Sequence, residues 1–304
     1  MRLDDLDPSE NVRDLGQGGG GGGFGGGGGN ILLGLLPMLL GSRLGCGTIA
    51  LIGIGVALFM AVGGGGGLLT GGGVAPTGPG QQQQAGQNKP CDTPEELQAC
   101  RVMRSTEQTW APLFAAEGAR YQPPVLSFYQ RGVQSGCGNA SSAAGPFYCP
   151  ADQGVYLDTS FFRELATRFG AAGDFAQNYV IAHEVGHHIQ NITGTMEKVR
   201  AAQARMNRAQ GNAMSVRVEL QADCYAGVWA ARNKDRLEAG DIEEGMRAAN
   251  AIGDDTLQRQ AQGTVVPESF THGTSAQRME WLRRGLASTD TNWLQQCDTF
   301  SGAT

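Results

Sequence analysis

The order of apolar and polar residues divides this chain of 304 residues into a folded part and parts of simpler composition. From residue 91 to 304, apolar residues are mixed with charged and polar ones throughout, which predicts one folded domain. Strand signals in it are sparse, and the best are the apolar runs at 124–129 and 154–158. The pattern therefore predicts an α+β domain that is rich in helices and contains a small sheet.

Three helix starts can be recognised from their capping residues. Thr93 is followed by a proline and two glutamates, which supply an N-cap, a residue suited to the first helical position and a capping-box partner. Asp241 with Glu244, and Thr274 with Gln277, have the same spacing of cap and partner. We expect a helix to begin at each of these places.

The apolar stretch at 44–62 contains neither charge nor proline. A helix needs about 20 such residues to cross a membrane, so we predict a membrane anchor at 30–64 with one transmembrane helix. Arg43 precedes the stretch and no charge follows it before Lys89. The positive-inside rule then places the N-terminus in the cytoplasm and the domain at 91–304 outside it, in the periplasm or at the cell surface.

Glycine accounts for 48 of the 304 residues, and most of the excess precedes residue 81. Residues 1–29, acidic at first and then almost all glycine, are predicted to be a disordered tail. Residues 63–90, rich in glycine, proline and glutamine, are predicted to be a flexible linker. The net charge is −6 and the basic residues are scattered singly, so we expect no nucleic-acid partner.

Six of the seven cysteines lie in the predicted domain, and the seventh lies in the apolar stretch. An even number of cysteines outside the cytoplasm favours disulfides, although spacing alone leaves several pairings open. Nearness in sequence favours the pairs Cys91 with Cys100, Cys137 with Cys149 and Cys224 with Cys297. Zinc binding by these cysteines is the weaker interpretation, because the chain has no Cys-x-x-Cys pair.

Residues 174–194 have the pattern of a buried helix that begins at Asp174 and ends at a glycine. Within it, His183, Glu184 and His187 form the motif His-Glu-x-x-His. Residues four apart lie on the same face of a helix, so the two imidazoles can bind one metal ion, and Glu184 can reach a water beside it. His188 points off this face and is predicted to be structural or to support the metal ligands from behind. The alternative is an ordinary core helix, in which the buried imidazoles and carboxylate would lack partners.

A catalytic zinc site commonly has three protein ligands, so one more must lie elsewhere in the chain. No histidine follows at the spacing of the metzincins. Glu219 and Asp223, four apart among apolar residues on a predicted helix, are the better candidates. We expect Glu219 to be the third ligand and Asp223 to accept a hydrogen bond from a ligating histidine. The alternative is a solvated acidic face.

With these residues identified, the sequence resembles the bacterial membrane-anchored neutral zinc metallopeptidases of the YpfJ-like group. The resemblance covers nearly all of residues 91–304 and implies one zinc ion per chain. It rests on several segments in the same order: CGNASSAAGPFYCPADQGVYLDTSFF, YVIAHEVGHHIQ, VRVELQADCYAGVW, GDIEEG, AIGDD and SFTHGTSAQR.

A more distant resemblance is to the HtpX-type and CAAX-prenyl-protease metallopeptidases, which combine His-Glu-x-x-His with Glu-x-x-x-Asp and a later Thr-His. Their glutamate is the third zinc ligand, which corresponds to Glu219. They have a proline where this chain has Gly273, and several membrane spans, so a prenyl-protein substrate is not implied. The late histidine, His272, could donate to the oxyanion of the tetrahedral intermediate, or it could be a packing residue. Arg278 could orient the same loop or pair with an acidic neighbour.

These observations predict a single-pass, membrane-anchored zinc metallopeptidase with a zincin-like domain. Zinc held by His183, His187 and Glu219 would activate water, and Glu184 would act as the general base. A peptide or protein substrate is expected to bind as an added strand beside an edge strand at 154–158. Two alternatives remain: a zinc hydrolase of a non-peptide amide of the cell wall, and an inactive membrane-tethered metal-binding scaffold.

Overall fold

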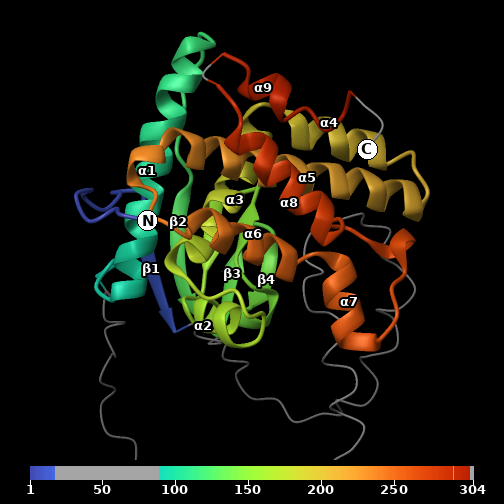
Figure 1. The fold of residues 1–304 in the computed structure, drawn as a ribbon, viewed down its shortest axis with the longest axis horizontal. Helices are drawn as coiled ribbons and strands as arrows, with labels where there is room; N and C mark the ends of the chain where they lie inside the picture. Colours follow the sequence, from blue (N-terminus) through green and yellow to red (C-terminus); the bar gives the residue numbers. More distant parts are fainter. Residues whose placement is uncertain (18–88, 290, 302–304) are drawn as a thin grey trace, which may run out of the picture.

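A four-stranded sheet with helices packed against it forms the framework of the folded domain (Figure 1). This computed structural model describes residues 1–17, 89–289 and 291–301. The sheet order is β1-β2-β6-β5, in which β1, β2 and β6 are parallel and β5 is antiparallel to β6. The strands are β1 (Val12–Gln17), β2 (Val125–Gln130), β5 (Phe147–Cys149) and β6 (Gly154–Leu157). The prediction of a helix-rich α+β domain with a small sheet is confirmed.

Alternating side chains give the sheet two buried faces. Leu126 pairs with Val155 and Phe128 with Leu157, and these four side chains belong to the main hydrophobic core. Tyr156, on the opposite face, packs in a smaller cluster that also contains Tyr129, Phe147 and Cys149. This second face is covered by the hairpin of β3 (Gly132–Ser135) and β4 (Gly138–Ser141).

The strand expected at the sheet edge lies inside the sheet. The run at 154–158 forms β6, which pairs with β2 on one side and with β5 on the other. The edge strand next to it is β5, whose three residues are too few to give a strand signal of their own. The expectation of an edge strand at 154–158 is therefore wrong, and β5 takes its place.

Residues 1–17 are part of the folded domain, which corrects the expectation of a disordered tail over 1–29. β1 pairs with β2 along the register Val12 to Leu126 through Asp14 to Phe128. Leu3 is 1% exposed and packs in the main core with Leu6. The apolar residues of this short segment are therefore buried against the rest of the chain, and only residues 18–29 of the expected tail lie outside the described residues.

The helices surround α3 (Asp174–Ile192), which packs against α1, α5, α6 and strand β5. Apolar side chains along α3 are almost all buried, as expected for the predicted buried helix. The other helices are α1 (Pro94–Ala116), α2 (Ser160–Thr167), α4 (Thr195–Gln203), α5 (Arg208–Arg232), α6 (Asp241–Ala251), α7 (Asp254–Gln262), α8 (Ser275–Leu286) and α9 (Trp293–Gln296).

Glycines allow close helix crossings at α5. A Cβ atom at Gly186 of α3 would lie 2.9 Å from the carbonyl oxygen of Ala222 of α5. At the crossing of α5 with α8, a Cβ atom at Gly227 would overlap the carbonyl oxygen of Leu282. Contacts this short exclude a side chain, so glycine at these positions lets the helices approach. The approach brings residues of α3, α5 and α8 together.

Two of the predicted helix starts are confirmed and two shift by a residue. Thr93 caps α1 by accepting from the backbone of Glu96, and Thr274 caps α8 in a reciprocal capping box with Gln277. Asp174 and Asp241 are instead the first helical residues of α3 and α6, and glycines occupy both N-cap positions. An aspartate in the first turn still favours the helix, because it faces the positive end of the helix dipole.

The six cysteines of the domain form the three bridges that nearness in sequence favoured. Cys91–Cys100 closes the start of α1, and Cys137–Cys149 joins the β3–β4 hairpin to β5. Cys224–Cys297 joins α5 to the end of α9. Each bridge therefore links neighbouring elements of the domain.

Among residues 1–17, 89–289 and 291–301, no helix has the length and apolar character needed to cross a membrane. The predicted transmembrane stretch at 44–62 and the predicted linker before residue 89 lie outside these described residues.

Candidate metal centre

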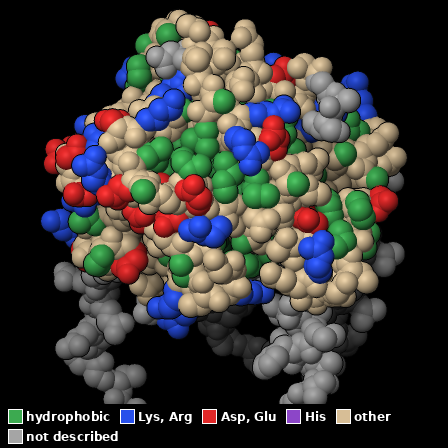
Figure 2. Space-filling model, in the orientation of Figure 1, with side chains coloured by type: hydrophobic (Ala, Val, Ile, Leu, Met, Phe, Trp, Pro, Cys, Tyr) green, Lys and Arg blue, Asp and Glu red, His purple; other side chains and the backbone are tan. Residues whose placement is uncertain are grey.

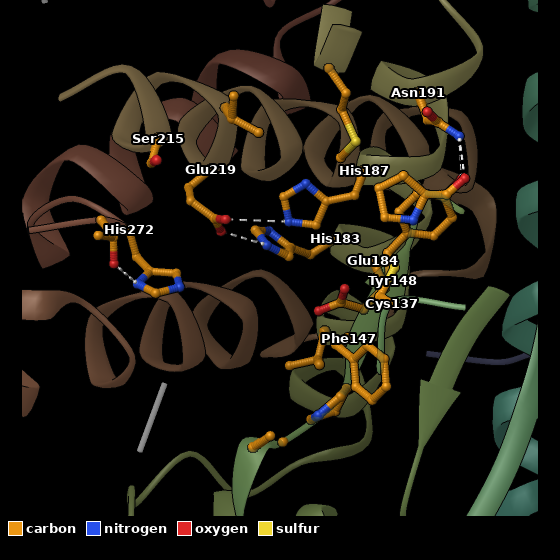
Figure 3. A pocket seen from close by; sticks show the side chains of 18 of the residues that line it. Cys137, Phe147, Tyr148, His183, Glu184, His187, Asn191, Ser215, Glu219 and His272 are labelled. Atoms are coloured by element: carbon orange, nitrogen blue, oxygen red, sulfur yellow. Dashed lines mark hydrogen bonds and ion pairs between the residues drawn. The ribbon is translucent and has the colours of Figure 1, made fainter. Parts of the chain in front are cut away.

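A cavity of about 990 Å³ lies where α3, α5, strand β5 and the loop before α8 meet. His183, Glu184 and His187 enter it from α3, Glu219 from α5 and His272 from the loop (Figure 3). Acidic and basic side chains are mixed on the face of the molecule shown in Figure 2, and no histidine reaches the surface there. The side chains that the sequence predicted to bind the metal ion and to take part in the reaction therefore line one cavity.

Three of these side chains present their ligand atoms to a common point. Nε2 of His183 lies 3.2 Å from Oε2 of Glu219, and Nε2 of His187 lies 3.6 Å from Oε1 of Glu219. The three candidate ligand atoms are all within 4.8 Å of one another. Ligands about 2.0–2.1 Å from a tetrahedral zinc ion lie about 3.3 Å apart, so this donor set fits zinc.

Hydrogen bonds hold both imidazoles in the orientation that a metal ligand needs. Nδ1 of His183 lies 2.8 Å from Oδ1 of Asp223, and Nδ1 of His187 lies 2.9 Å from Oε1 of Gln190. Both oxygens are acceptors, so each Nδ1 carries a proton and Nε2 is the ring nitrogen of each histidine that can bind a metal ion. Gln190 was not singled out from the sequence, although its position three residues after His187 on the same helix is the signal that could have identified it.

Arg278 pairs with Asp223, which was one of its two expected roles. Nε of Arg278 lies 2.9 Å from Oδ2 of Asp223, and Nη2 lies 2.9 Å from Oδ1. The hydroxyl of Tyr179 also donates to Oδ1 of Asp223 at 2.6 Å. Tyr179 was not predicted from the sequence, although its place one helical turn before His183 is a signal that could have identified it. The carboxylate that orients His183 is thus itself fixed by two buried donors.

The pKa values of Glu219 and Asp223 show that their surroundings keep both carboxylates charged. Burial alone would raise the pKa of Glu219, but His187, His272 and His183 hold it well below its usual range. Burial would also raise the pKa of Asp223, and Arg278 and His183 lower it to about 2. Both carboxylates are therefore ionised at neutral pH, and Glu219 can act as an anionic ligand.

Glu184 lies beside the three donors but outside their set. The residue is 7% exposed and lines the cavity, and its carboxylate has no hydrogen-bond partner among the described residues. Burial raises the pKa of Glu184, and this rise is partly offset by His187 and His183. A carboxylate with a raised pKa is suited to taking up and releasing a proton near neutral pH.

His188 is a structural residue, which is one of the two roles predicted for it. Its Nε2 donates to the carbonyl oxygen of Gln122 at 2.6 Å, and its Nδ1 lies 3.0 Å from the hydroxyl of Tyr148. Burial lowers the pKa of His188 to about 4, so it is neutral at physiological pH. Both ring nitrogens are used within the protein and neither is available to a metal ion.

His272 lies at the cavity wall on the loop between α7 and α8. Its Nδ1 is 3.2 Å from Oδ1 of Asp254 and 3.0 Å from the hydroxyl of Thr271. In Figure 3 the opposite side of the ring faces the part of the cavity that holds His183 and Glu219. Asp254 was not identified as a site residue from the sequence, because only the fold brings the start of α7 against this loop.

The edge strand and its disulfide form another part of the cavity wall. Phe147 and Tyr148 of β5 and Cys137 of the hairpin all line the cavity. Because β5 is the last strand in its sheet, its outer edge faces no other strand of that sheet. Residues of this edge strand, and none of residues 154–158, line the cavity that holds the donor set.

A helix with His-Glu-x-x-His, a carboxylate from a neighbouring helix and a free glutamate beside them define a site of the zinc-dependent hydrolase type. Comparison with known proteins agrees with this class. The family described as "Putative neutral zinc metallopeptidase" matches residues 1–300, and the chain belongs to this family. No solved structure matches the chain.

Two bacterial relatives are similar to this chain over about two thirds of its length. "Uncharacterized protein YpfJ" of Escherichia coli (strain K12) is 50% identical over 214 residues, which cover 68% of this chain and 74% of the relative. "Uncharacterized protein Rv2575" of Mycobacterium tuberculosis (strain ATCC 25618 / H37Rv) is 43% identical over 221 residues, which cover 67% of this chain and 71% of the relative.

Proposed function

We propose that this protein is a zinc-dependent endopeptidase with one zinc ion, held by His183, His187 and Glu219. The observation that carries the proposal is the spacing of the three donors, 3.2 and 3.6 Å between imidazole and carboxylate, together with the acceptors behind both imidazoles. When bound, zinc supplies a Lewis acid that polarises the substrate carbonyl and makes a water molecule acidic near neutral pH. The remaining steps depend on side chains of the protein.

Glu184 is the general base of the proposed reaction. Its buried carboxylate has no partner in the described residues, so its oxygen atoms are free to accept the proton of the attacking water. The carboxyl group then passes the same proton to the nitrogen of the leaving amine as the peptide bond breaks. The raised pKa of Glu184 favours both transfers near neutral pH.

His272 is proposed to stabilise the oxygen of the scissile carbonyl as negative charge develops. It lines the same cavity as the three donors and faces them. A hydrogen bond of this type contributes about 100- to 1000-fold to turnover in other hydrolases. Arg278 takes no direct part, because it is 1% exposed and its guanidinium is used by Asp223.

The substrate is proposed to be an extended peptide that binds along the outer edge of β5. Strand addition uses backbone hydrogen bonds, so it accepts many sequences, and the adjoining cavity then selects side chains. Phe147 and Tyr148 of β5 line the cavity, which places this edge beside the donor set. An antiparallel edge strand beside the His-Glu-x-x-His helix also supports the zincin-like character predicted from the sequence.

A membrane location is part of the proposal and rests on the apolar stretch at 44–62. The pairing of β1 with β2 requires that residues 1–17 and the domain after residue 89 lie on one side of that membrane. We therefore propose that the chain enters and leaves the membrane on the same side.

The test uses the full-length chain, purified in mild detergent and loaded with zinc, and a diverse peptide mixture analysed by mass spectrometry. Glu184→Gln removes the proton acceptor and should abolish cleavage while the zinc content, measured by plasma mass spectrometry, stays at one ion per chain. The matched control is Glu197→Gln, the same change in an exposed carboxylate that also lines the cavity.

The expected result is a set of cleavages in the wild type and in the control that is absent from Glu184→Gln. Cleavage that persists in Glu184→Gln would overturn the role of Glu184. A folded, zinc-loaded wild type that cuts no peptide but hydrolyses cell-wall amides would replace the peptidase by the non-peptide hydrolase. A protein inactive on both, with zinc present, would support a metal-binding scaffold.

A further inference from the structure

The carboxylate of Asp254 accepts several hydrogen bonds from the loop that carries His272. Its Oδ2 accepts the backbone N–H groups of Thr271 at 2.7 Å, His272 at 2.7 Å and Gly273 at 3.2 Å. The N–H of Asp254 returns a bond to the carbonyl oxygen of Gly273 at 2.9 Å. Gly273 has φ +91°, a conformation that favours glycine and turns the chain around the carboxylate. The loop is thus wrapped around one buried side chain.

The second oxygen of the same carboxylate reaches the imidazole. Oδ1 of Asp254 lies 3.2 Å from Nδ1 of His272. Burial alone would raise the pKa of Asp254, but hydrogen bonds from His272 and from the loop hold it below its usual range. The ionised carboxylate can only accept hydrogen bonds, so Nδ1 of His272 carries a proton.

The neighbouring carboxylate, Asp255, makes similar bonds but does not reach the imidazole. Its Oδ1 accepts the backbone N–H of Ser275 at 2.7 Å and the hydroxyl of Ser275 at 2.9 Å. The two adjacent aspartates at the start of α7 therefore both accept backbone hydrogen bonds from the segment before and at the start of α8. Only Asp254 also contacts the imidazole of His272. A comparison of substitutions at Asp254 and Asp255 therefore distinguishes a loss of backbone contacts from a loss of the contact with His272.

We propose that Asp254 is a positioning residue for His272. By holding Nδ1–H, it turns Nε2 toward the substrate, where the N–H of the protonated ring can donate to the developing negative charge on the carbonyl oxygen. The inference rests on the proposed peptidase function and assigns to Asp254 a part in its transition state. No atom of Asp254 contacts the substrate in this arrangement.

The kinetic test compares Asp254→Asn with the matched control Asp255→Asn in the full-length, zinc-loaded protein. Asparagine keeps an oxygen for the backbone N–H groups but loses the charged acceptor for Nδ1. We expect kcat to fall about 10- to 100-fold in Asp254→Asn with little change in KM, and to change less than about threefold in Asp255→Asn. Equal kcat values in the two variants would overturn the proposal.

A double-mutant cycle with His272→Gln separates positioning from a general loss of structure. If Asp254 acts through His272, Asp254→Asn should cause no further loss of kcat in the His272→Gln protein. If the two losses multiply, Asp254 acts on turnover independently of the histidine and the proposal is wrong.

A third measurement does not depend on activity or on a stable variant. The chain has four histidines, so the ring nitrogens of His272 can be assigned in ¹⁵N–¹H spectra by comparison with His272→Gln. The wild-type ring should carry a proton on Nδ1, where it faces Asp254, as well as on Nε2, from which it donates, and an Nδ1 without a proton would overturn the proposal. If no peptide is cleaved, this readout still tests the Asp254 contact, so failure of the proposed function and failure of the positioning role are distinguishable.

Discussion

At the scale of single residues, Asp223 is the group on which most of the site depends. It accepts hydrogen bonds from Tyr179, His183 and Arg278, and its side chain is 0% exposed. A buried ion pair contributes little net stability when complete, but removing one partner leaves an unpaired charge in the interior. Asp223 should therefore affect both the free energy of unfolding and the orientation of a metal ligand.

Asp223→Asn should lower the free energy of unfolding by about 3–5 kcal/mol, because Arg278 keeps its charge and loses the carboxylate. It should also weaken zinc binding about 10- to 100-fold, because the amide holds Nδ1 of His183 less well. Urea unfolding and a competition titration with a zinc chelator measure the two effects.

Glu280→Gln provides the control on the neighbouring helix α8. Glu280 is 48% exposed and pairs with Arg283 and Arg284 at the surface, so its loss should cost less than about 1 kcal/mol and leave zinc affinity unchanged. Equal losses of stability in the two variants would contradict the assignment of the buried pair as the sensitive one.

At the scale of elements, the metal centre depends on how closely α3 and α5 cross. His183 and His187 lie on either side of Gly186, whose missing side chain lets α5 approach to 2.9–3.0 Å of the Cβ position. Glu219 lies one turn before Ala222, the residue that fills this space. The glycine inside the motif thus brings the carboxylate within reach of both imidazoles.

Gly186→Ala should push α3 and α5 apart, lower the free energy of unfolding by about 1–3 kcal/mol and weaken zinc binding. The control is Gly211→Ala, also in a helix, where an added Cβ meets nothing within 4 Å. That change should raise stability by about 0.5–1 kcal/mol, because alanine favours the helix. Thermal unfolding and zinc titration distinguish the two, and unchanged zinc affinity in Gly186→Ala would contradict this account.

Sequence patterns predicted the helical parts of the site better than the others. Helical periodicity is local. Residue spacing was therefore enough to predict that His183 and His187 share one helix face and that Glu219 and Asp223 share another. Strand β5 is too short for a local signal, and its edge position depends on pairing with a distant segment. Asp254 reaches His272 across 18 positions, which spacing alone does not predict.

At the scale of the whole molecule, residues 1–17 belong to the same folded unit as the catalytic domain. β1 lies beside β2, and Leu3 is buried in the main core. The intervening residues 18–88 include the apolar stretch that we expected to cross a membrane once. Under the membrane location proposed above, both flanks of that stretch lie in one compartment, so that β1 can pair with β2.

Two epitope tags in the full-length chain test this arrangement, one inserted in the glycine run after residue 17 and one placed after residue 304. In sealed membrane vesicles, we expect protease to remove both tags or neither, and to remove both after detergent is added. Removal of only one tag from intact vesicles would place the flanks on opposite sides and contradict the pairing of β1 with β2.

The sequence by itself determined the donors of the metal centre, the helix that carries two of them, the preferred cysteine pairs and the helix-rich class of the domain. These features follow from local periodicity, from the chemistry of residue types and from short separations along the chain. The tertiary structure decided the edge strand, the folded state of residues 1–17 and the contacts of Gln190, Tyr179 and Asp254 around the site. Strand order and helix crossings arise from burying apolar surface between segments far apart in sequence, and no local pattern encodes which segments will meet.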